Sequence, residues 1–261
     1  MAPNRKHEEP VAANAAKPAK ARIDLLLVER GLAPSRERAQ ALLLAGVVRV
    51  DGAHIDKPGT RVSSNAQIQL AGDPVRYVSR GGLKLEGALE DFAVSPRDRI
   101  CLDVGSSTGG FTDCLLQHGA RKVYCLDVTI DQLDWKLRND PRVVTIEKNA
   151  RYLQPGDIPE KIDLLTVDVS FISVAKILPS LVPIAAVSAD FLILIKPQFE
   201  LEKRDVGRGG IVRDAALHQQ AIDRVTKAVA DSGLLPHAVR PSRITGAEGN
   251  QEFFLHARRG E

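Results

Sequence analysis

The feature that most constrains the fold is an alternation of strand-like and helix-like segments that begins near residue 100. Short apolar runs with the length of buried strands occur at residues 100–104, 123–128, 143–146, 164–169, 191–195 and 253–257. Segments of helix length, such as 110–117 and 215–232, separate most of them. This alternation predicts an α/β fold in which helices cover both faces of a mainly parallel, doubly wound sheet.

The chain before this region has a different pattern. Residues 1–20 are rich in Ala, Pro, Lys and Asn without a hydrophobic period, which predicts a disordered tail. Over residues 21–72 we expect a small α+β domain with two short helices and strands at 48–50 and 68–70. Ser35 is the expected cap of the second helix, and Asp51-Gly52 is typical of a hairpin turn. Residues 73–80 are then a linker, and residues 81–261 form the α/β domain.

Charge is distributed unevenly between these parts. Residues 1–80 hold 13 lysines and arginines against 8 aspartates and glutamates, whereas the remaining 181 residues hold 23 against 25. A basic front domain on a near-neutral body is typical of a module that binds a polyanion.

Composition argues against several other classes of protein. The three cysteines, Cys101, Cys114 and Cys125, lie in apolar runs and form no CxxC pair, so we expect buried thiols and neither a disulfide framework nor a metal site. No apolar run approaches the roughly 20 residues that span a bilayer. The first residues contain no apolar segment of the kind found in secretion signals. We therefore expect a cytoplasmic protein without a membrane partner.

A glycine-rich segment follows the first strand of the α/β region and leads into a helix. Such a turn lets a ligand approach the backbone beside the positive end of the helix. Its Gly-x-x-x-Gly-Gly spacing differs from the GxGxxG of dinucleotide sites. The Asp103 carboxylate would repel a pyrophosphate but suits a ligand with an ammonium and a sulfonium, which favours S-adenosylmethionine. The candidate contacts are Asp103, Gly105, Ser106, Ser107, Thr108, Gly109, Gly110 and Phe111.

Further candidate contacts follow the next two strands. Asp127, 22 residues after Gly105, can accept hydrogen bonds from ribose hydroxyls, as an acid at this place does for either ligand class. Val128 adjoins it, and Asn149 and Ala150 follow the third strand, where an adenine would lie. The alternative is a tight structural turn that binds nothing.

Four residues at expected strand or helix ends carry the candidate chemistry: Lys84, Asp168, Lys196 and Glu252. Ligands of open α/β sheets bind beyond the carboxyl ends of the strands, where Asp168 and Lys196 fall. A ribose hydroxyl must lose its proton as it is methylated, and a lysine can take that proton where its surroundings disfavour its charged form. We assign Lys196 as the base, Asp168 as its orienting partner, and Lys84 and Glu252 as positioning groups. Taken singly, each also fits a surface ion pair.

Residues 22–70 resemble the RNA-binding domain named after the fourth protein of the small ribosomal subunit. The matching residues include Arg30-Gly31, Ser35-Arg36, Ala39-Gln40 and Asp51-Gly52. The resemblance implies an RNA-facing groove, and arginines at a helix start without an aromatic platform suit phosphates and duplex shape. The alternative is a solvated polar face on a helical hairpin. The candidate RNA contacts are Arg22, Arg36, Arg38, Arg49, Lys57 and Arg80.

The chain as a whole resembles the TlyA family of ribosomal RNA cytidine 2′-O-methyltransferases, whose catalytic domain is similar to FtsJ-type ribose methyltransferases. The resemblance is carried by the strings SRGGLKLEGAL, DVGSSTGGFTDCLLQ, QLDWKLRNDPRV and GGIVRD. It implies a Rossmann-like class I methyltransferase whose Lys–Asp–Lys–Glu order maps onto Lys84, Asp168, Lys196 and Glu252.

The same resemblance implies S-adenosylmethionine as cofactor and ribosomal RNA or ribosomal subunits as partner, with no stable protein partner indicated. Two segments depart from the family pattern. Residues 127–131 are bulkier than its usual glycine-rich stretch, and the linker Arg76-Tyr77-Val78-Ser79 lacks a tryptophan. Two alternatives stay open: a membrane-active hemolysin, and a non-catalytic RNA-binding factor in ribosome assembly.

Overall fold

The structure is a computed structural model that describes residues 19–33, 35–44, 46–70, 76–246 and 249–260. The predicted tail therefore lies almost entirely outside the described residues, as does the first part of the predicted linker. The chain divides into two compact units, residues 1–74 and residues 75–261.

The first unit is a small α+β domain, as predicted. Strands β2 and β5 have the expected bounds, and β3-β2-β5 form an antiparallel sheet beside the β1–β4 pair. Asp51 and Gly52 both have positive φ, as a tight two-residue hairpin turn requires. The Ser35 hydroxyl accepts a hydrogen bond from the Arg38 amide at 3.2 Å, which confirms the predicted helix cap. The elements are β1 (Lys20–Arg22), α1 (Ile23–Glu29), α2 (Arg36–Leu44), β2 (Val48–Val50), β3 (Ala53–His54), β4 (Arg61–Ser63) and β5 (Ile68–Leu70).

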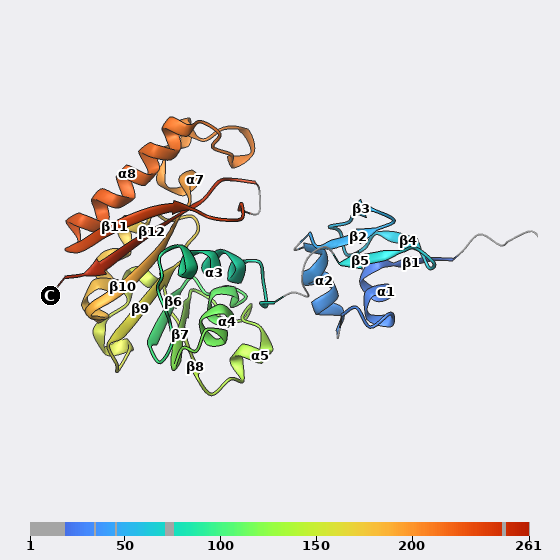
Figure 1. The fold of residues 1–261 in the computed structure, drawn as a ribbon, viewed down its shortest axis with the longest axis horizontal. Coiled ribbons are helices and arrows are strands. Elements are labelled where there is room, and N and C mark those ends of the chain that lie inside the picture. Colours follow the sequence, from blue (N-terminus) through green and yellow to red (C-terminus); the bar gives the residue numbers. More distant parts are fainter. Residues whose placement is uncertain (1–18, 34, 45, 71–75, 247–248, 261) are drawn as a thin grey trace, which may run out of the picture. The chain divides into compact units, whose positions relative to one another are not determined.

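The second unit is built on a 7-stranded sheet with the order β11-β12-β10-β9-β6-β7-β8 (Figure 1). The strands from β10 to β8 are parallel, and β12 runs antiparallel between β10 and β11. This confirms the prediction of a mainly parallel sheet. Strand β11, at one edge of the sheet, was not predicted. The strands are β6 (Ile100–Val104), β7 (Lys122–Asp127), β8 (Val143–Glu147), β9 (Ile162–Val167), β10 (Ala185–Ile195), β11 (Leu234–Pro241) and β12 (Phe253–Arg259).

Helices cover both faces of this sheet, and each face has its own apolar core. Helices α3 and α4 pack on one face, which we call the α3 face, while α6 and α8 pack on the other (Figure 1). The α-helices are α3 (Gly81–Asp91), α4 (Gly110–Gln117), α5 (Trp135–Arg138), α6 (Leu178–Leu181), α7 (Pro197–Glu200) and α8 (Ala215–Asp231). Short 3-10 helices are η1 (Ala150–Tyr152), η2 (Pro155–Asp157), η3 (Val174–Lys176), η4 (Val182–Ile184), η5 (Lys203–Asp205) and η6 (Arg208–Gly210).

Side chains alternate between the two cores along each buried strand. In β10, Phe191, Ile193 and Ile195 belong to the core under α8, whereas Leu192 and Leu194 belong to the α3 face. Lys196 follows in extended backbone conformation and so continues the row of Leu192 and Leu194. The alternation thus directs this lysine toward the α3 face.

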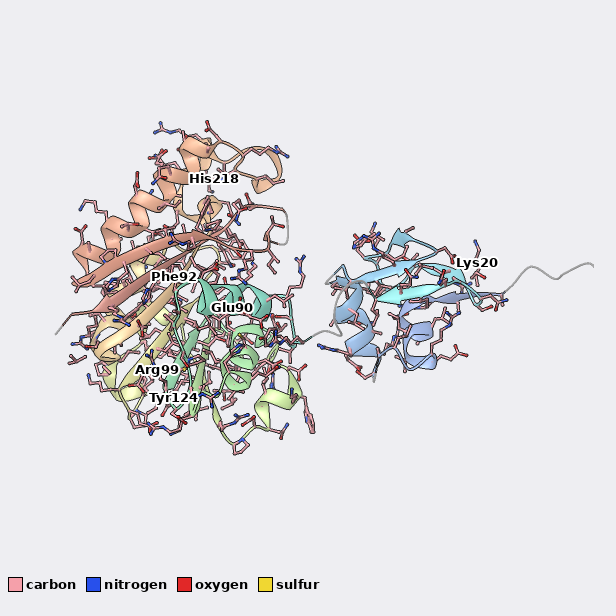
Figure 2. The ribbon with its side chains drawn as sticks, in the orientation of Figure 1. Lys20, Glu90, Phe92, Arg99, Tyr124 and His218 are labelled. Carbon is pink, nitrogen blue, oxygen red and sulfur yellow. The ribbon has the colours of Figure 1, made fainter. Side chains whose placement is uncertain are left out.

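A buried charge network is centred on Asp190, in the middle of β10. The Asp190 carboxylate accepts hydrogen bonds from Arg99, His256 and Arg258 at 2.6–2.8 Å. Burial disfavours its charge, but these donors together keep the pKa of Asp190 well below its ordinary value. Arg99 and Phe92, which packs against His256, are labelled in Figure 2. Asp190 lies in the middle of β10, six residues before Lys196, so this network supports the sheet away from the candidate site.

The described part of the predicted linker packs against α3 and α4. Tyr77 is buried, and a Cβ atom on Gly82 would lie 2.3 Å from its ring. The Val78 amide donates to Asp113 at 2.8 Å, and the Gln117 side chain donates to the Arg76 carbonyl at 2.8 Å. These residues are therefore an integral part of the second unit.

Candidate active site

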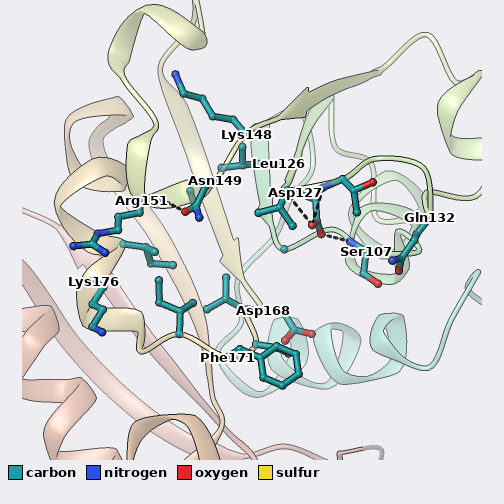
Figure 3. Close-up of a pocket in the computed structure, with 18 residues that line it drawn as sticks. Ser107, Leu126, Asp127, Gln132, Lys148, Asn149, Arg151, Asp168, Phe171 and Lys176 are labelled. Carbon is teal, nitrogen blue, oxygen red and sulfur yellow. Dashed lines mark hydrogen bonds between the residues drawn. The ribbon is translucent and has the colours of Figure 1, made fainter.

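A pocket of about 590 Å³ opens at the carboxyl ends of β6, β7, β8 and β9. Figure 3 shows Ser107 and Asp127 on one side of it, Arg151 and Lys176 on the opposite side, and Asp168 and Phe171 along one edge. Its volume lies in the range of small-molecule sites, and its place is where open α/β sheets bind ligands. The sequence-predicted residues that line it are Gly105, Ser107, Asp127, Val128, Asn149, Ala150 and Asp168.

The glycines of the loop between β6 and α4 are required by neighbouring segments of the protein. Gly105 has φ +85°, and a Cβ atom there would lie 2.2 Å from the carbonyl oxygen of Asp168. Gly109 has φ +93° and lies against Leu137, while Gly110 lies against the Ser79 hydroxyl. Of the three, only Gly105 lines the pocket. Close packing therefore explains Gly109 and Gly110, which were expected to contact the cofactor.

Asp127 joins this loop to the segment after β7. Its carboxylate accepts hydrogen bonds from the Ser107 amide at 2.8 Å and from the Val128 amide at 2.7 Å. The Ser107 amide would otherwise be available to a phosphate at this turn. The pocket therefore offers a carboxylate at the place where a dinucleotide site offers backbone amides.

Asp103, expected to face the ligand, lies below the loop and outside the pocket lining. It shares the α3 face with Cys101, and its carboxylate accepts a hydrogen bond from the Thr112 hydroxyl of α4 at 2.7 Å. Burial raises the pKa of Asp103 to about 7. Alternation along β6 places the side chain in the interior, where its bond with Thr112 fastens α4, the helix that follows the loop.

Three other loop residues also lie outside the pocket lining. Phe111 is buried in the core of the α3 face, with its ring 6.1 Å from that of Phe254. Ser106 is buried, and its hydroxyl finds no hydrogen-bond partner among the described residues. Thr108 is exposed, and its carbonyl accepts from the Asp134 amide at 3.2 Å.

The four candidate catalytic residues form two ion pairs. Lys84 Nζ of α3 lies 2.6 Å from Glu252 Oε2, and the Lys196 ammonium pairs with the Asp168 carboxylate. Lys196 Nζ also donates to the Ser170 hydroxyl at 3.1 Å. Extended alternation along β9, β10 and β12 directs Asp168, Lys196 and Glu252 toward the α3 face, from which Lys84 comes. Both lysines keep side chains only 12% exposed.

The sequence patterns did not single out the loop that follows Asp168. Ser170 binds Lys196, and Phe171 is 92% exposed with φ +65° while its ring lies 5.1 Å from that of Phe199. The loop also continues the pocket lining through Ile172. The signal available in the sequence was a polar residue and an aromatic residue shortly after a strand end that carries a candidate catalytic residue.

In the first unit, two of the predicted RNA contacts also serve the fold. The buried Asp24 carboxylate accepts hydrogen bonds from Arg22 at 2.8 Å, Arg36 at 3.0 Å and Gln40 at 3.2 Å. These bonds, led by that of Arg22, hold the pKa of Asp24 well below its ordinary value. The guanidinium groups of Arg22 and Arg36 are thereby fixed at the surface, since their side chains remain 39% and 50% exposed.

The other predicted RNA contacts lie at different places. Arg49 and Lys57 are exposed on the first unit, and Arg38 is half-buried there. Arg80 belongs to the second unit, where it precedes α3.

The described residues contain neither a cluster of three or more potential metal ligands nor a helix long and apolar enough to cross a membrane. The three cysteines are free and buried, and burial raises the pKa of Cys114 and of Cys125 to about 12. These thiols are held in an unreactive form.

Comparison with known proteins agrees with both units. Residues 77–259 match the family described as FtsJ-like methyltransferase, and residues 21–68 match the S4 domain. The 16S/23S rRNA (cytidine-2′-O)-methyltransferase TlyA of Mycobacterium tuberculosis is 47% identical over 92% of this chain and 90% of its own length. A solved structure from Streptococcus thermophilus that bears the name hemolysin is 42% identical, covers 94% of this chain and 90% of its own, and has a TM-score of 0.74.

The same fold occurs in an S-adenosylmethionine-dependent methyltransferase from Mesorhizobium loti, with a TM-score of 0.52 at 15% identity over 67% of this chain and 98% of that one. The fold and the site together define a Rossmann-like methyltransferase domain, which follows an S4 domain, a type that binds RNA, along the chain. Within that class, the chain belongs to the TlyA family of FtsJ-like methyltransferases.

The residues present fit S-adenosylmethionine. The pocket has the size of a small-molecule site, and both signs of charge line it: the carboxylates Asp127 and Asp168, and the basic residues Lys148, Arg151 and Lys176. This suits S-adenosylmethionine, which carries an ammonium, a sulfonium and a carboxylate. Asp127 already accepts the loop amide that a pyrophosphate would need. The fit therefore favours the methyl donor over a dinucleotide.

Proposed function

We propose that this protein transfers a methyl group from S-adenosylmethionine to the 2′-hydroxyl of a cytidine in ribosomal RNA. The observation that carries the proposal is the pairing of Lys196 with Asp168 and of Lys84 with Glu252 on one face of the sheet, with Asp168 also lining the pocket. The printed activity of the relative from Mycobacterium tuberculosis supports the choice of cytidine and ribosomal RNA.

The chain would hold the cofactor by the residues that line the pocket. Asp127 is placed to accept hydrogen bonds from ribose hydroxyls, and Val128, Asn149 and Ala150 would contact the adenine. Gly105 and Ser107 border the remaining part, and Asp103 fastens α4, which follows the loop. When bound, S-adenosylmethionine supplies a methyl group made electrophilic by its sulfonium.

The two ion pairs would activate the hydroxyl. In its neutral form, which the positive charge of the bound donor would favour, Lys196 Nζ would take the proton of the 2′-hydroxyl as the oxygen acquires the methyl group, so the lysine would act as general base. Asp168 and Ser170 orient its amine. Lys84 and Glu252 lie on the same face of the sheet and would hold the ribose in place. Orientation of this kind supplies much of the acceleration in reactions between two bound partners.

The first unit would bind ribosomal RNA or a ribosomal subunit through phosphate contacts in the cytoplasm. Arg49 and Lys57 are exposed, and Arg22 and Arg36 are presented by Asp24. Arg38 and Arg80 would add contacts from α2 and from the start of α3. Fixed arginines suit phosphates because their donors need little reordering on binding.

Methyl transfer to purified 30S and 50S subunits from a strain lacking this protein tests the proposal. Incorporation of labelled methyl groups, followed by mass mapping of ribonuclease fragments, should locate a 2′-O-methylcytidine in at least one ribosomal RNA. Label on a base, or no label on either subunit, would contradict it. Free ribosomal RNA and transfer RNA serve as substrate controls.

A further inference from the structure

A buried carboxylate links the segments that follow β9 and β10. Glu200, at the end of α7, accepts a hydrogen bond from the Ser173 hydroxyl at 2.6 Å and another from the Val174 amide at 2.9 Å. Its side chain is almost fully buried, and no ion pair is found for it among the described residues. Burial raises the pKa of Glu200, although the two donors oppose this effect. A carboxylate is costly to bury without hydrogen bonds, so the contacts with Ser173 and Val174 offset much of that cost.

The same two segments also meet at the candidate base. Lys196 immediately precedes α7, and its amine contacts Asp168 and Ser170 of the loop after β9. That loop then runs to Ser173, which Glu200 holds. The contacts therefore form a closed ring, in which Lys196 and Glu200 from one segment each bind the other segment.

The loop between these two contacts has little regular structure of its own. Phe171 has φ +65°, a left-handed conformation that a bulky residue adopts only when its surroundings require it. Its ring contacts Phe199 of α7, a second link between the segments. Without an anchor at Ser173 and Val174, the strained loop would be free to relax, and Asp168 and Ser170 would move with it.

We propose that Glu200 is a positioning residue for methyl transfer, which keeps Asp168 and Ser170 against the Lys196 amine by anchoring Ser173 and Val174. The inference rests on the proposed function, because it takes Lys196 as the base. Glu200 itself lines neither the pocket nor the face that carries the two ion pairs, so its effect passes through Lys196.

The test compares Glu200→Ala, Glu200→Gln and Ser173→Ala with Glu202→Ala, an exposed glutamate two residues away. Glutamine keeps both contacts of Glu200, because its side-chain carbonyl can accept from the Val174 amide and its side-chain amide can donate to the Ser173 hydroxyl. We expect Glu200→Ala to lower the single-turnover rate at saturating cofactor and subunits by about tenfold or more, the scale of a misplaced reacting group. Ser173→Ala, which loses one of two contacts, should fall between Glu200→Ala and wild type. Glu200→Gln and Glu202→Ala should stay near wild type, and cofactor affinity should change little.

A second measurement reads the position of Lys196 without methyl transfer. Acylation of its amine by an N-hydroxysuccinimide ester, followed by peptide mass spectrometry, should be faster in Glu200→Ala and Ser173→Ala than in wild type. Both measurements are made well below the thermal unfolding midpoint of every variant. A change in stability alone then alters neither the transfer rate nor the acylation rate. If Glu200→Ala does not fold, Ser173→Ala carries the test.

The inference is overturned if these variants keep wild-type transfer and wild-type Lys196 reactivity, or if Glu200→Gln is as impaired as Glu200→Ala. Absence of transfer by the wild-type protein would instead refute the proposed function. Lys196 reactivity would then still decide whether Glu200 positions this amine.

Discussion

The Lys196 ammonium pairs with the Asp168 carboxylate across the neighbouring ends of β10 and β9. The register of these strands sets Val167 beside Ile193, and β10 continues for two more residues to Ile195. Asp168 and Lys196 each directly follow the last residue of a buried strand. Side chains that project from strand ends are held more firmly than those on free loops. The pair is therefore suited to hold an amine at a fixed place beside the pocket.

Replacement of Lys196 by alanine should separate chemistry from binding. We expect affinity for S-adenosylmethionine to stay near wild type, since Lys196 does not line the pocket, while methyl transfer falls by about 10²-fold or more. Calorimetry and single-turnover assays measure the two effects. Lys203→Ala, which removes an exposed lysine from the same region, is the matched control. Single-turnover transfer near the wild-type rate in Lys196→Ala would show that another group takes the proton.

Gly105 brings the loop between β6 and α4 against the backbone of Asp168. In Gly105→Ala the left-handed backbone alone costs about 1–2 kcal/mol, and the new Cβ atom would press on the Asp168 carbonyl oxygen. Gly233→Ala has the same backbone cost but open space around the Cβ atom. We therefore expect both variants to lower the free energy of unfolding, and Gly105→Ala alone to lose most methyl transfer. Urea unfolding and transfer assays check this; equal activities would mean that Asp168 tolerates the displacement.

Much of the second unit could be predicted because buried strands have a strong local signal. The bounds of β6 and α4 agree with the sequence pattern, since an apolar run and a glycine-rich turn mark them. Strand β11 was missed because Pro236 and Pro241 argue against a strand; the structure tolerates them at a sheet edge, with a register shift after Pro236.

Helix α3 was missed for a different reason. Gly81, Gly82 and Gly87 give its sequence low helix propensity, yet the structure needs two of them small. Gly82 lies against Tyr77, and Gly87 against Arg243. Tertiary packing that no local pattern reveals thus decides this helix.

In the candidate site, too, the sequence predicts the residues better than the contacts between them. Order and residue type led to the four candidate catalytic residues, but the pairing of Lys84 with Glu252 depends on contacts between distant segments. For Asp103, the charge argument predicted a ligand contact, whereas alternation along β6 already placed it on the side of the buried Cys101. Periodicity was the better guide there.

The buried Asp103 should make stability depend on pH. Its pKa in the folded protein is about 7, above the value of an exposed carboxyl, so the folded state retains a proton that the unfolded chain releases. This group therefore favours folding at low pH, and its contribution is lost as the pH rises from about 4 to 7. Asp103→Asn, which keeps an acceptor for Thr112, should remove this dependence. Urea unfolding at pH 5 and pH 8 should show the variant gaining stability relative to wild type at pH 8; a pH-independent difference would contradict the assignment.

The last prediction concerns the division of labour between the two units. The second unit has its own sheet and two apolar cores, and the described residues of its predicted linker pack within it. A fragment that starts at Val75 should therefore fold and bind S-adenosylmethionine. It should lose most of its affinity for ribosomal subunits, because the exposed basic residues Arg49 and Lys57 lie in the first unit and phosphate contacts supply much of such affinity.

Salt dependence makes this prediction specific. Binding of the intact protein should weaken steeply with salt, as expected when several phosphate contacts release counterions, whereas residual binding of the fragment should respond less. The double variant Arg49→Ala and Lys57→Ala should fall between the two, and Arg97→Ala, an exposed arginine of the second unit, is its control. Fluorescence titration of each protein against purified subunits at two salt concentrations measures affinities and slopes. Equal affinities with equal slopes for the intact protein and the fragment would mean that the first unit does not carry RNA recognition.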